Sequence, residues 1–299
     1  MIADRILTAV NMIIHDPATY DGIYVFLGMM FYALELYADF TGGIDITIGT
    51  AELFGIHLKE NFHRPYFSKN IAEYWRRWHL SLSFWFRDYL FYPLSISKPA
   101  VRFGKWGKKC FGIRIGKIFP AMFALFIVWF STGLWHDSSW KYILWGVANG
   151  VILMSSLFLE PYFQKWKAFF HIREESGAWQ LFCLVRTFFL VAALKVFPGS
   201  PTTQGVFDTV RRIFTDFRPS LAFEAWFPKL VPQDLIFLAI GLTAMLAVDL
   251  VQEKQPVRAL IARQNTMLRW LLYLGALAGI LIMGTFSISM TGGFAYAQF

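Results

Sequence analysis

The chain has 299 residues, of which 56% are hydrophobic and only 16% are charged. A soluble domain is typically less apolar and carries about 25% charged residues, so an ordinary soluble protein is excluded. We predict an all-α fold, a polytopic transmembrane helical bundle with amphipathic or re-entrant helices beside it. The net charge of +8 does not favour nucleic-acid binding, because the basic residues fall in short segments between apolar runs, as orientation signals do.

Six apolar runs are candidates to cross a bilayer, which takes about 20 helical residues. We expect these spans at residues 23–38, 118–135, 140–159, 180–197, 234–252 and 270–290. The first and the fourth are short for a full crossing. The chain is therefore expected to pass through the membrane several times.

The segments between the spans predict how the chain is oriented. The loop 98–117 is rich in lysine and arginine and contains no acid, so we expect it in the cytoplasm. The longer segment 198–234 is sparser in basic residues and is expected on the outer side. Apolar residues at helical spacing predict an amphipathic surface helix within it, namely Val206, Phe207, Val210, Ile213 and Phe214.

Residues 71–92 are predicted to form one amphipathic helix at the membrane interface. On a 3.6-residue period the apolar face would gather Ile71, Trp75, Trp78, His79, Leu82, Phe86 and Tyr89. The charged residues Glu73, Arg76, Arg77, Arg87 and Asp88 would fall mostly opposite. Glu73 and Arg77 are expected to form an ordinary i,i+4 ion pair.

Two histidines are the strongest pointers to function. His79 and His136 both lie in aromatic settings, and a titratable imidazole at membrane depth is costly unless it has a role. Spacing alone leaves simpler interpretations open, because His136 can be a solvated helix-end residue and His79 an interfacial one. Asp39 and Asp45 flank the sequence Phe-Thr-Gly-Gly and fit a turn or helix cap as readily as a site.

Five motifs change this balance. They are Tyr-Ala-Asp-Phe-Thr-Gly-Gly-Ile-Asp at 37–45, Asn-Phe-His-Arg-Pro-Tyr at 61–66, Glu-Tyr-Trp-Arg-Arg-Trp-His-Leu-Ser-Leu-Ser at 73–83, Trp-Phe-Arg-Asp-Tyr-Leu at 85–90 and Gly-Leu-Trp-His at 133–136. In order and spacing the set resembles the membrane-bound O-acyltransferase family, and within it the bacterial branch similar to alginate O-acetyltransferases. A set of this length is far more specific than one short motif.

The resemblance implies that His136 is the principal catalytic histidine and His79 the second functional one. It also implies that Trp75, Arg76, Trp78, Trp135 and Asp39 contact substrate. The implied reaction moves an acyl group, with acetyl the first candidate, from a cytoplasmic thioester to a hydroxyl of a cell-surface polysaccharide or secreted partner. Histidine would accept the hydroxyl proton, and the two histidines would approach the reaction from opposite sides of the membrane.

The partners that the resemblance implies are the lipid bilayer, an acyl donor, a secreted partner with an SGNH-hydrolase-like fold and a cell-surface polysaccharide. Acetyl-coenzyme A or an acyl carrier protein would act as cosubstrate, and we expect neither a metal nor a tightly bound cofactor. The expected location is the inner (cytoplasmic) membrane of a bacterial cell. No nucleic-acid partner is expected.

The start of the chain, Met1–Arg5, resembles an internal stretch of the family. We therefore expect residues 1–299 to be the C-terminal portion of a single membrane domain, with the family's N-terminal helices missing. Two alternatives stay open. A polytopic transporter or export subunit also carries ionisable residues at membrane depth, although we find no repeated halves; a catalytically inactive fragment of the family would keep the motifs without the activity.

Overall fold

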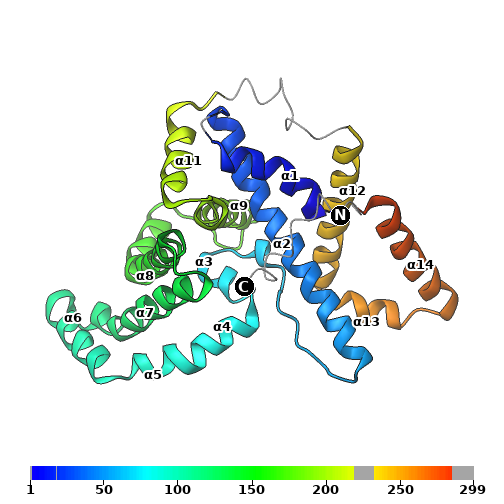
Figure 1. Cartoon of the computed structure of the whole chain (residues 1–299). Coiled ribbons are helices and arrows are strands. Elements are labelled where there is room, and N and C mark those ends of the chain that lie inside the picture. The colour runs from blue at the N-terminus through cyan, green and yellow to red at the C-terminus, as the bar shows by residue number, and fades with distance from the viewer. Residues whose placement is uncertain (1, 18, 219–231, 285–299) are drawn as a thin grey trace. The chain divides into compact units, whose positions relative to one another are not determined.

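The computed structural model describes residues 2–17, 19–218 and 232–284, and every regular element in these ranges is helical (Figure 1). The chain divides into two compact units. The first comprises the residues up to Ile56 together with those from Asp208 onward, and the second runs from His57 to Phe207. Each unit is considered by itself below.

Six helices of the described chain are long and apolar enough to cross a membrane, which confirms the predicted spans. They are α2 (Gly22–Leu53), α7 (Phe119–His136), α8 (Trp140–Phe169), α9 (Gly177–Leu194, prolonged by α10, Val196–Gly199), α12 (Pro232–Gln252) and α14 (Thr266–Met283). The predicted end of the last span, at residue 290, lies outside the described residues.

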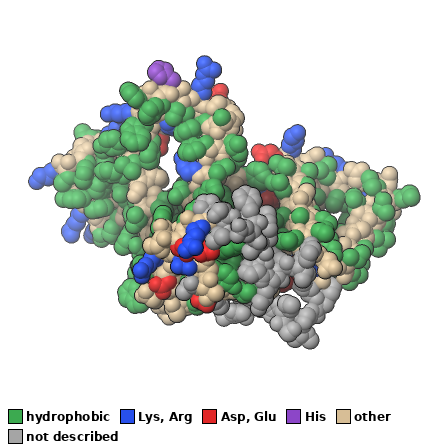
Figure 2. All heavy atoms as spheres, turned by 90° about the horizontal axis from the view of Figure 1, so that it is seen from above, with side chains coloured by type: hydrophobic (Ala, Val, Ile, Leu, Met, Phe, Trp, Pro, Cys, Tyr) green, Lys and Arg blue, Asp and Glu red, His purple; other side chains and the backbone are tan. Residues whose placement is uncertain are grey.

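Apolar side chains face outward from these helices. Hydrophobic side chains cover much of the described surface in Figure 2, and none of the apolar window of α14 is buried within the chain. Lipid tails tolerate such a surface, whereas water does not. The chain is therefore an all-α polytopic membrane protein, as its composition predicts.

Helix α2 corrects two predictions. The expected span 23–38 ends before Asp39, but the observed helix continues through Gly42 and Gly43 to Leu53. Neither a turn nor a helix cap forms between Asp39 and Asp45. A glycine inside a helix costs only about 1 kcal/mol relative to alanine, which the apolar residues of so long a helix readily offset.

The first unit is built around α1 (Ile2–His15), which lies along α2. One core cluster joins Ile6, Val10 and Ile14 of α1 to Leu238 of α12. A second joins Ile13 to Val25, with Ile213 of α11 (Thr203–Thr215) packed against it. Two further helices, α13 (Val257–Ala262) and α14, follow α12.

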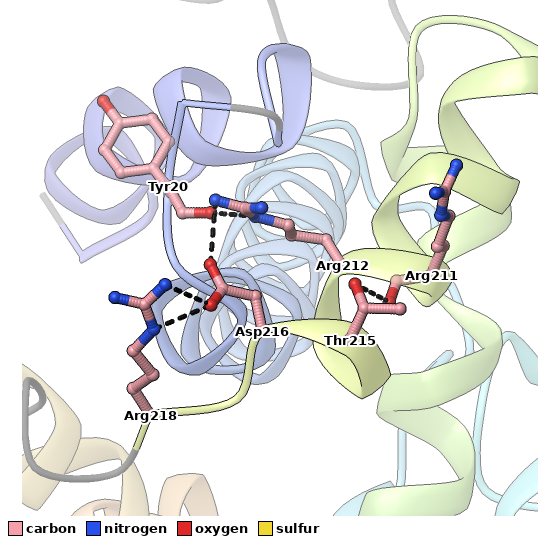
Figure 3. Close-up of polar contacts among 6 residues, drawn as sticks. All are labelled: Tyr20, Arg211, Arg212, Thr215, Asp216 and Arg218. Atoms are coloured by element: carbon pink, nitrogen blue, oxygen red, sulfur yellow. Dashed lines mark hydrogen bonds and ion pairs between the residues drawn. The ribbon is translucent and has the colours of Figure 1, made fainter.

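Helix α11 is the amphipathic helix that the sequence predicts. The residue that follows α11 binds the first residue of α2, because the backbone N–H of Gly22 donates to the carbonyl of Asp216 at 2.9 Å. Arg212 donates to the Tyr20 carbonyl at 2.8 Å, and the Asp216 carboxylate forms ion pairs with Arg212 and Arg218 at 2.9 and 2.7 Å (Figure 3). The two helix ends are thus tied through both backbone and side chains.

The second unit centres on the antiparallel hairpin of α7 and α8, which adjoin in Figure 1 and are joined by only Asp137–Ser139. Small residues let the two backbones approach. A Cβ added to Gly146 of α8 would lie 2.3 Å from the Trp129 carbonyl, and one added to Gly133 of α7 would lie 2.5 Å from the Tyr142 carbonyl. This is the close packing that small residues on facing helices permit in a membrane.

The basic segment 98–117, expected as a loop, is largely helical. It forms α6 (Lys98–Gly116), which is interrupted at Gly112, where φ is 81°. Ser97 caps its first turn and Pro99 occupies the start, both of which favour a helix. The prediction of a loop was wrong because it considered only the basic residues and not the N-cap serine and the proline at the start of the helix.

The interfacial segment 71–92 is not one helix. It is divided into α3 (Ile71–Trp75), α4 (Leu80–Phe86), a π-helical turn (Arg87–Phe91) and α5 (Tyr92–Ser95). The predicted faces hold in part, since Ile71, Trp78 and Phe86 are buried while Tyr89 is 68% exposed. The predicted ion pair forms, with Arg77 and Glu73 at 2.6 Å. The break between α3 and α4 falls at His79, within the candidate site.

Candidate functional site

The turn that carries His79 is held by backbone hydrogen bonds to the segment 61–63. The N–H of His63 donates to the carbonyl of Arg77 at 2.8 Å, and the N–H of Leu80 donates to the carbonyl of Asn61 at 2.9 Å. Between these two hydrogen bonds His79 adopts a left-handed conformation, with φ 49° and ψ 59°. A residue other than glycine rarely takes this conformation unless its surroundings enforce it, and such strain concentrates at functional sites.

The side chain of Asn61 fixes the imidazole of His79. Its Oδ1 accepts from the backbone N–H and the hydroxyl of Ser81 at 3.0 and 3.1 Å, and Nδ1 of His79 lies 3.3 Å away. Because both Ser81 donors require an acceptor at this position, a neutral imidazole places its proton on Nδ1. Nε2 then carries the lone pair and can accept a proton.

His79 is held in its neutral form. Burial, and to a smaller extent the positive charge of Lys195, lower its pKa from the usual value near 6.5 to about 4. At neutral pH the ring is therefore uncharged. A neutral imidazole is the state that a proton acceptor requires.

His136 ends α7 and is surrounded by aromatic rings. Its ring centroid lies 4.9 Å from that of Trp135 and 5.1 Å from that of Trp145, and it is stacked with Tyr142 at 6.0 Å and an interplanar angle of 17°. The turn to α8 follows at once, with the Asp137 carboxylate accepting from the N–H and hydroxyl of Ser139. Those hydrogen bonds hold the pKa of Asp137 below its ordinary value and make it a helix-entry residue.

The structure brings the two histidines together at one indole. The centroid of Trp135 lies 4.9 Å from that of His136 and 6.4 Å from that of His79. Trp135 is 51% exposed, so this shared ring is open to a ligand. The two histidines thus lie near one another, and the membrane side from which each approaches the reaction stays a prediction.

The other predicted site residues take different places. Trp75 and Trp78 lie in the aromatic cluster of the second unit, where Nε1 of Trp75 donates to Asn149 at 3.1 Å. Arg76 is an exposed residue that ends α3, and none of the described contacts joins it to a histidine. Asp39 lies within α2, in the first unit rather than in the one that contains both histidines.

Asn149 connects two members of the aromatic cluster through hydrogen bonds. It is completely buried, and while its Oδ1 accepts from Trp75 its Nδ2 donates to the carbonyl of Trp145 at 2.9 Å. The ring of Trp75 is in turn 4.7 Å from that of Trp129 and 5.7 Å from that of Trp145. The Asn149 amide therefore holds the indole of Trp75 in the cluster that also contains Trp145, a neighbour of His136.

A buried lysine completes the cluster. Lys195 directly follows α9, is only 3% exposed, and places Nζ 4.5 Å from the ring centroid of Trp78. The ring centroids of Trp75 and Trp145 lie 5.8 and 5.9 Å from the same nitrogen. The ammonium group thus faces three indole rings, and none of the ion pairs among the described residues includes it.

Sequence reasoning missed four of these residues: Asn61, Trp145, Asn149 and Lys195. Asn61 lies in a quoted motif, but only the fold shows that it binds His79. Lys195 had a usable signal, because it is one of only two basic residues, with Arg186, inside the apolar run 180–197, and an ionisable residue in such a run is itself a functional-site candidate. Trp145 and Asn149 of α8 had no comparable signal, because the sequence around them is apolar throughout.

A pocket of about 810 Å³ lies elsewhere in the second unit, between α8, α9 and the residues that precede α3. Its lining includes Lys69, Ser156, Trp179 and Arg186. It contains neither histidine. The histidine cluster therefore remains the candidate for chemistry.

Comparison with known proteins identifies relatives of this chain. No family model matches. The chain is 37% identical over 138 residues to the probable alginate O-acetylase AlgI of Azotobacter vinelandii, a match that covers 46% of this chain and 24% of that protein. It is 33% identical over 177 residues to the teichoic acid D-alanyltransferase of Bacillus subtilis, covering 58% of this chain and 41% of the relative.

A third relative is the peptidoglycan O-acetyltransferase of Helicobacter pylori, 33% identical over 131 residues, or 44% of this chain and 22% of that protein. The chain therefore matches less than half of the length of each of these three relatives. The three names describe the transfer of acetyl or D-alanyl groups and refer to alginate, teichoic acid and peptidoglycan. They confirm the resemblance that the five motifs predict.

Proposed function

We propose that this chain is a membrane-bound O-acyltransferase that modifies a hydroxyl group of a polysaccharide or other polymer, and its similarity to the alginate O-acetylase, the teichoic acid D-alanyltransferase and the peptidoglycan O-acetyltransferase supports this. The observation that carries the proposal is the placement of His79 and His136 against the same exposed indole, Trp135. Their motifs are far apart in the sequence. A pair of interfacial histidines with no shared role has no reason to converge in this way.

We assign His136 as the general base. Its imidazole accepts the proton of the acceptor hydroxyl while that oxygen attacks the carbonyl carbon of a thioester, so that no covalent enzyme intermediate is needed. His79 is the second functional histidine. Its Nδ1 is directed to Asn61, which leaves Nε2 as the nitrogen that can accept a hydrogen bond from substrate.

The aromatic residues supply the binding surface. The exposed Trp135 offers a flat apolar face beside both histidines, while Trp75 and Trp78 belong to the aromatic cluster around Lys195. Holding donor and acceptor against such rigid walls would give much of the rate, since well-oriented reactants can gain about 7 to 11 kcal/mol relative to a bimolecular reaction. The contributions of Arg76 and Asp39 to binding also remain part of this proposal.

The substrates follow from the chemistry. We propose acetyl-coenzyme A or an acylated carrier protein as the cytoplasmic donor, with acetyl as the first acyl group to test and D-alanyl as the second. The acceptor is a cell-surface polysaccharide, reached directly or through a secreted partner with an SGNH-hydrolase-like fold. With the basic helix α6 in the cytoplasm, the chain would lie in the inner membrane of a bacterium.

The test follows labelled acyl groups into the surface polymer of cells that express the full chain. Labelled acetate and labelled D-alanine are supplied in parallel to cells with wild type, His136→Ala or His79→Ala. We expect transfer of one label by wild type, a loss of about 10³-fold for His136→Ala and a smaller loss for His79→Ala. Equal labelling in all three strains and in cells without the chain would refute the proposal.

A matched control is His57→Ala. His57 is exposed and belongs to the same unit as both site histidines, but none of the described contacts joins it to the cluster. Its substitution should leave labelling unchanged. Substrate movement across the membrane without acylation would favour a transporter instead.

A further inference from the structure

We propose that Lys195 and the indole N–H of Trp145 together stabilise the negative charge that develops on the carbonyl oxygen of the acyl donor. This inference rests on the proposed function and adds two catalytic groups to it. Both groups belong to the unit that contains His79 and His136, and both lie against the same aromatic cluster as His136.

The position of Lys195 is the first observation. Only 3% of Lys195 is exposed, and the residue follows a helix apolar enough to span a membrane. A buried ammonium group far from any partner is strongly unfavourable, yet here the charge meets ring faces at 4.5 to 5.9 Å instead of a carboxylate. Ring faces attract a cation without neutralising it, so the charge stays available to an anion.

The surroundings argue against a purely structural lysine. A cation that only held helices together would be paired with an acid, and the acids that the structure describes in ion pairs are all bound to other bases. Methionine or leucine would fill the same space among indoles without the desolvation that a charge requires. The charge itself is therefore what this position supplies.

The indole of Trp145 is the second, independent observation. It is 4% exposed, and its buried Nε1 makes no hydrogen bond with any described residue. Most buried donors in proteins are satisfied, so an unsatisfied one points to a ligand that is absent from the structure. The ring centroid of Trp145 lies 5.1 Å from that of His136 and 5.9 Å from Nζ of Lys195, so the base and the cation both lie near the indole that carries this donor.

The reaction step accounts for every group. The acceptor hydroxyl oxygen forms a bond to the thioester carbonyl carbon, its proton moves to the imidazole of His136, and the electron pair of the C=O double bond moves onto oxygen. Lys195 and Trp145 stabilise that oxyanion. The oxyanion then re-forms the C=O bond, the C–S bond breaks with its electron pair on sulfur, and the imidazolium returns the proton to give a thiol and an ester.

The experiment compares two donors in membrane vesicles prepared from expressing cells. One donor is acetyl-coenzyme A and the other is its dithioester analogue, in which sulfur replaces the carbonyl oxygen. A sulfur anion is a poor partner for an ammonium ion or an N–H group, so wild type should strongly prefer the oxygen donor. We expect Lys195→Met to lower the turnover number with acetyl-coenzyme A by about 10²-fold and to reduce that preference in the same proportion.

Two further variants separate the charge and the N–H from packing. Lys195→Arg keeps the charge and should restore part of the rate. Trp145→Phe keeps an aromatic ring but removes the N–H, and should lower the rate by about tenfold while reducing the same preference. The exposed Lys165 on α8 provides a matched control, because Lys165→Met should change neither quantity.

The outcomes are distinct. If wild-type vesicles transfer no more label than vesicles without the chain, the proposed function is wrong and the oxyanion role falls with it. If wild type is active but Lys195→Met and Trp145→Phe keep the wild-type preference between donors, only the oxyanion role is refuted, whatever their absolute rates. A variant that merely folds poorly would lower both rates equally and leave the preference unchanged.

Discussion

Oδ1 of Asn61 lies 3.3 Å from Nδ1 of His79, across a turn in which the histidine backbone is left-handed. The same oxygen accepts two hydrogen bonds from Ser81, so its position does not depend on the histidine. Asn61 is therefore a positioning residue, which selects the imidazole tautomer and orients the ring. Its removal should affect the use of His79 more than the binding of substrate.

We expect Asn61→Ala to lower the turnover number of acyl transfer by about tenfold with little change in KM, because a neutral imidazole loses the partner that sets its tautomer. Vesicle assays with varied donor concentration measure both constants. Asn265→Ala is the matched control, since Asn265 caps α14 in the first unit through the N–H of Leu268 at 2.9 Å. A comparable fall in turnover for both variants would contradict the positioning role.

The pKa of His79 predicts a dependence of stability on pH. Between its usual pKa of about 6.5 and the folded value of about 4, the unfolded chain binds a proton at this site and the folded chain does not. The free energy of unfolding therefore falls as pH decreases through this window, by roughly 3 kcal/mol in total from this group. Above pH 6.5 the contribution is fully present.

Melting temperatures in detergent at pH 7 and pH 5 test this expectation. The decrease between the two values should be smaller for His79→Gln than for wild type, whereas the exposed His57→Gln should behave as wild type does. An identical decrease in all three proteins would show that His79 does not gain a proton on unfolding.

Gly146→Ala should separate α7 from α8, because the added Cβ would lie 2.3 Å from the carbonyl of Trp129 and that backbone cannot yield locally. We expect a loss of roughly 2 to 4 kcal/mol in stability together with a loss of acyl transfer, since His136 ends one of the two helices. Gly275→Ala is a suitable control, as nothing lies within 4 Å of the added atom in α14. Thermal unfolding in detergent and the transfer assay should report both effects together.

Gly22→Ala should weaken the junction of α2 with α11. Its Cβ would lie 2.5 Å from the carbonyl of Arg212, beside the hydrogen bond from Gly22 to Asp216. We expect a destabilisation of roughly 2 kcal/mol or more. The same substitution at Gly42, in the middle of α2 with nothing within 4 Å, should be neutral or slightly stabilising, and a melting-temperature series of the two variants decides the matter.

Apolar length predicted the membrane spans well, because the bilayer imposes one requirement on every crossing. It failed where a local contact outweighs periodicity. The helical period continues smoothly through His79, yet the chain turns there, where the Asn61 carbonyl accepts from the N–H of Leu80 and the N–H of His63 donates to the carbonyl of Arg77. The sequence of residues 71–92 alone does not indicate that Asn61 and His63 bind there.

The candidate site was predicted in part for a similar reason. The motifs identified both histidines, and Trp135 was expected at the site because it precedes His136. Lys195 comes from α9, and its proximity to Trp78 depends on how that helix packs, which no local pattern specifies. Whether the chain represents only the C-terminal portion of a single domain stays a prediction.

The order of the residues along the chain also bears on how the site is assembled during synthesis. The turn of His79 depends on partners fewer than about 20 positions away, so it is a low-contact-order element that can form early. The hairpin of α7 and α8 follows, and it completes the surroundings of His136. Lys195 is synthesised last, after both histidines and after the three tryptophans that it faces, Trp75, Trp78 and Trp145. A chain that has been synthesised only as far as α8 would therefore contain both histidines without the buried positive charge.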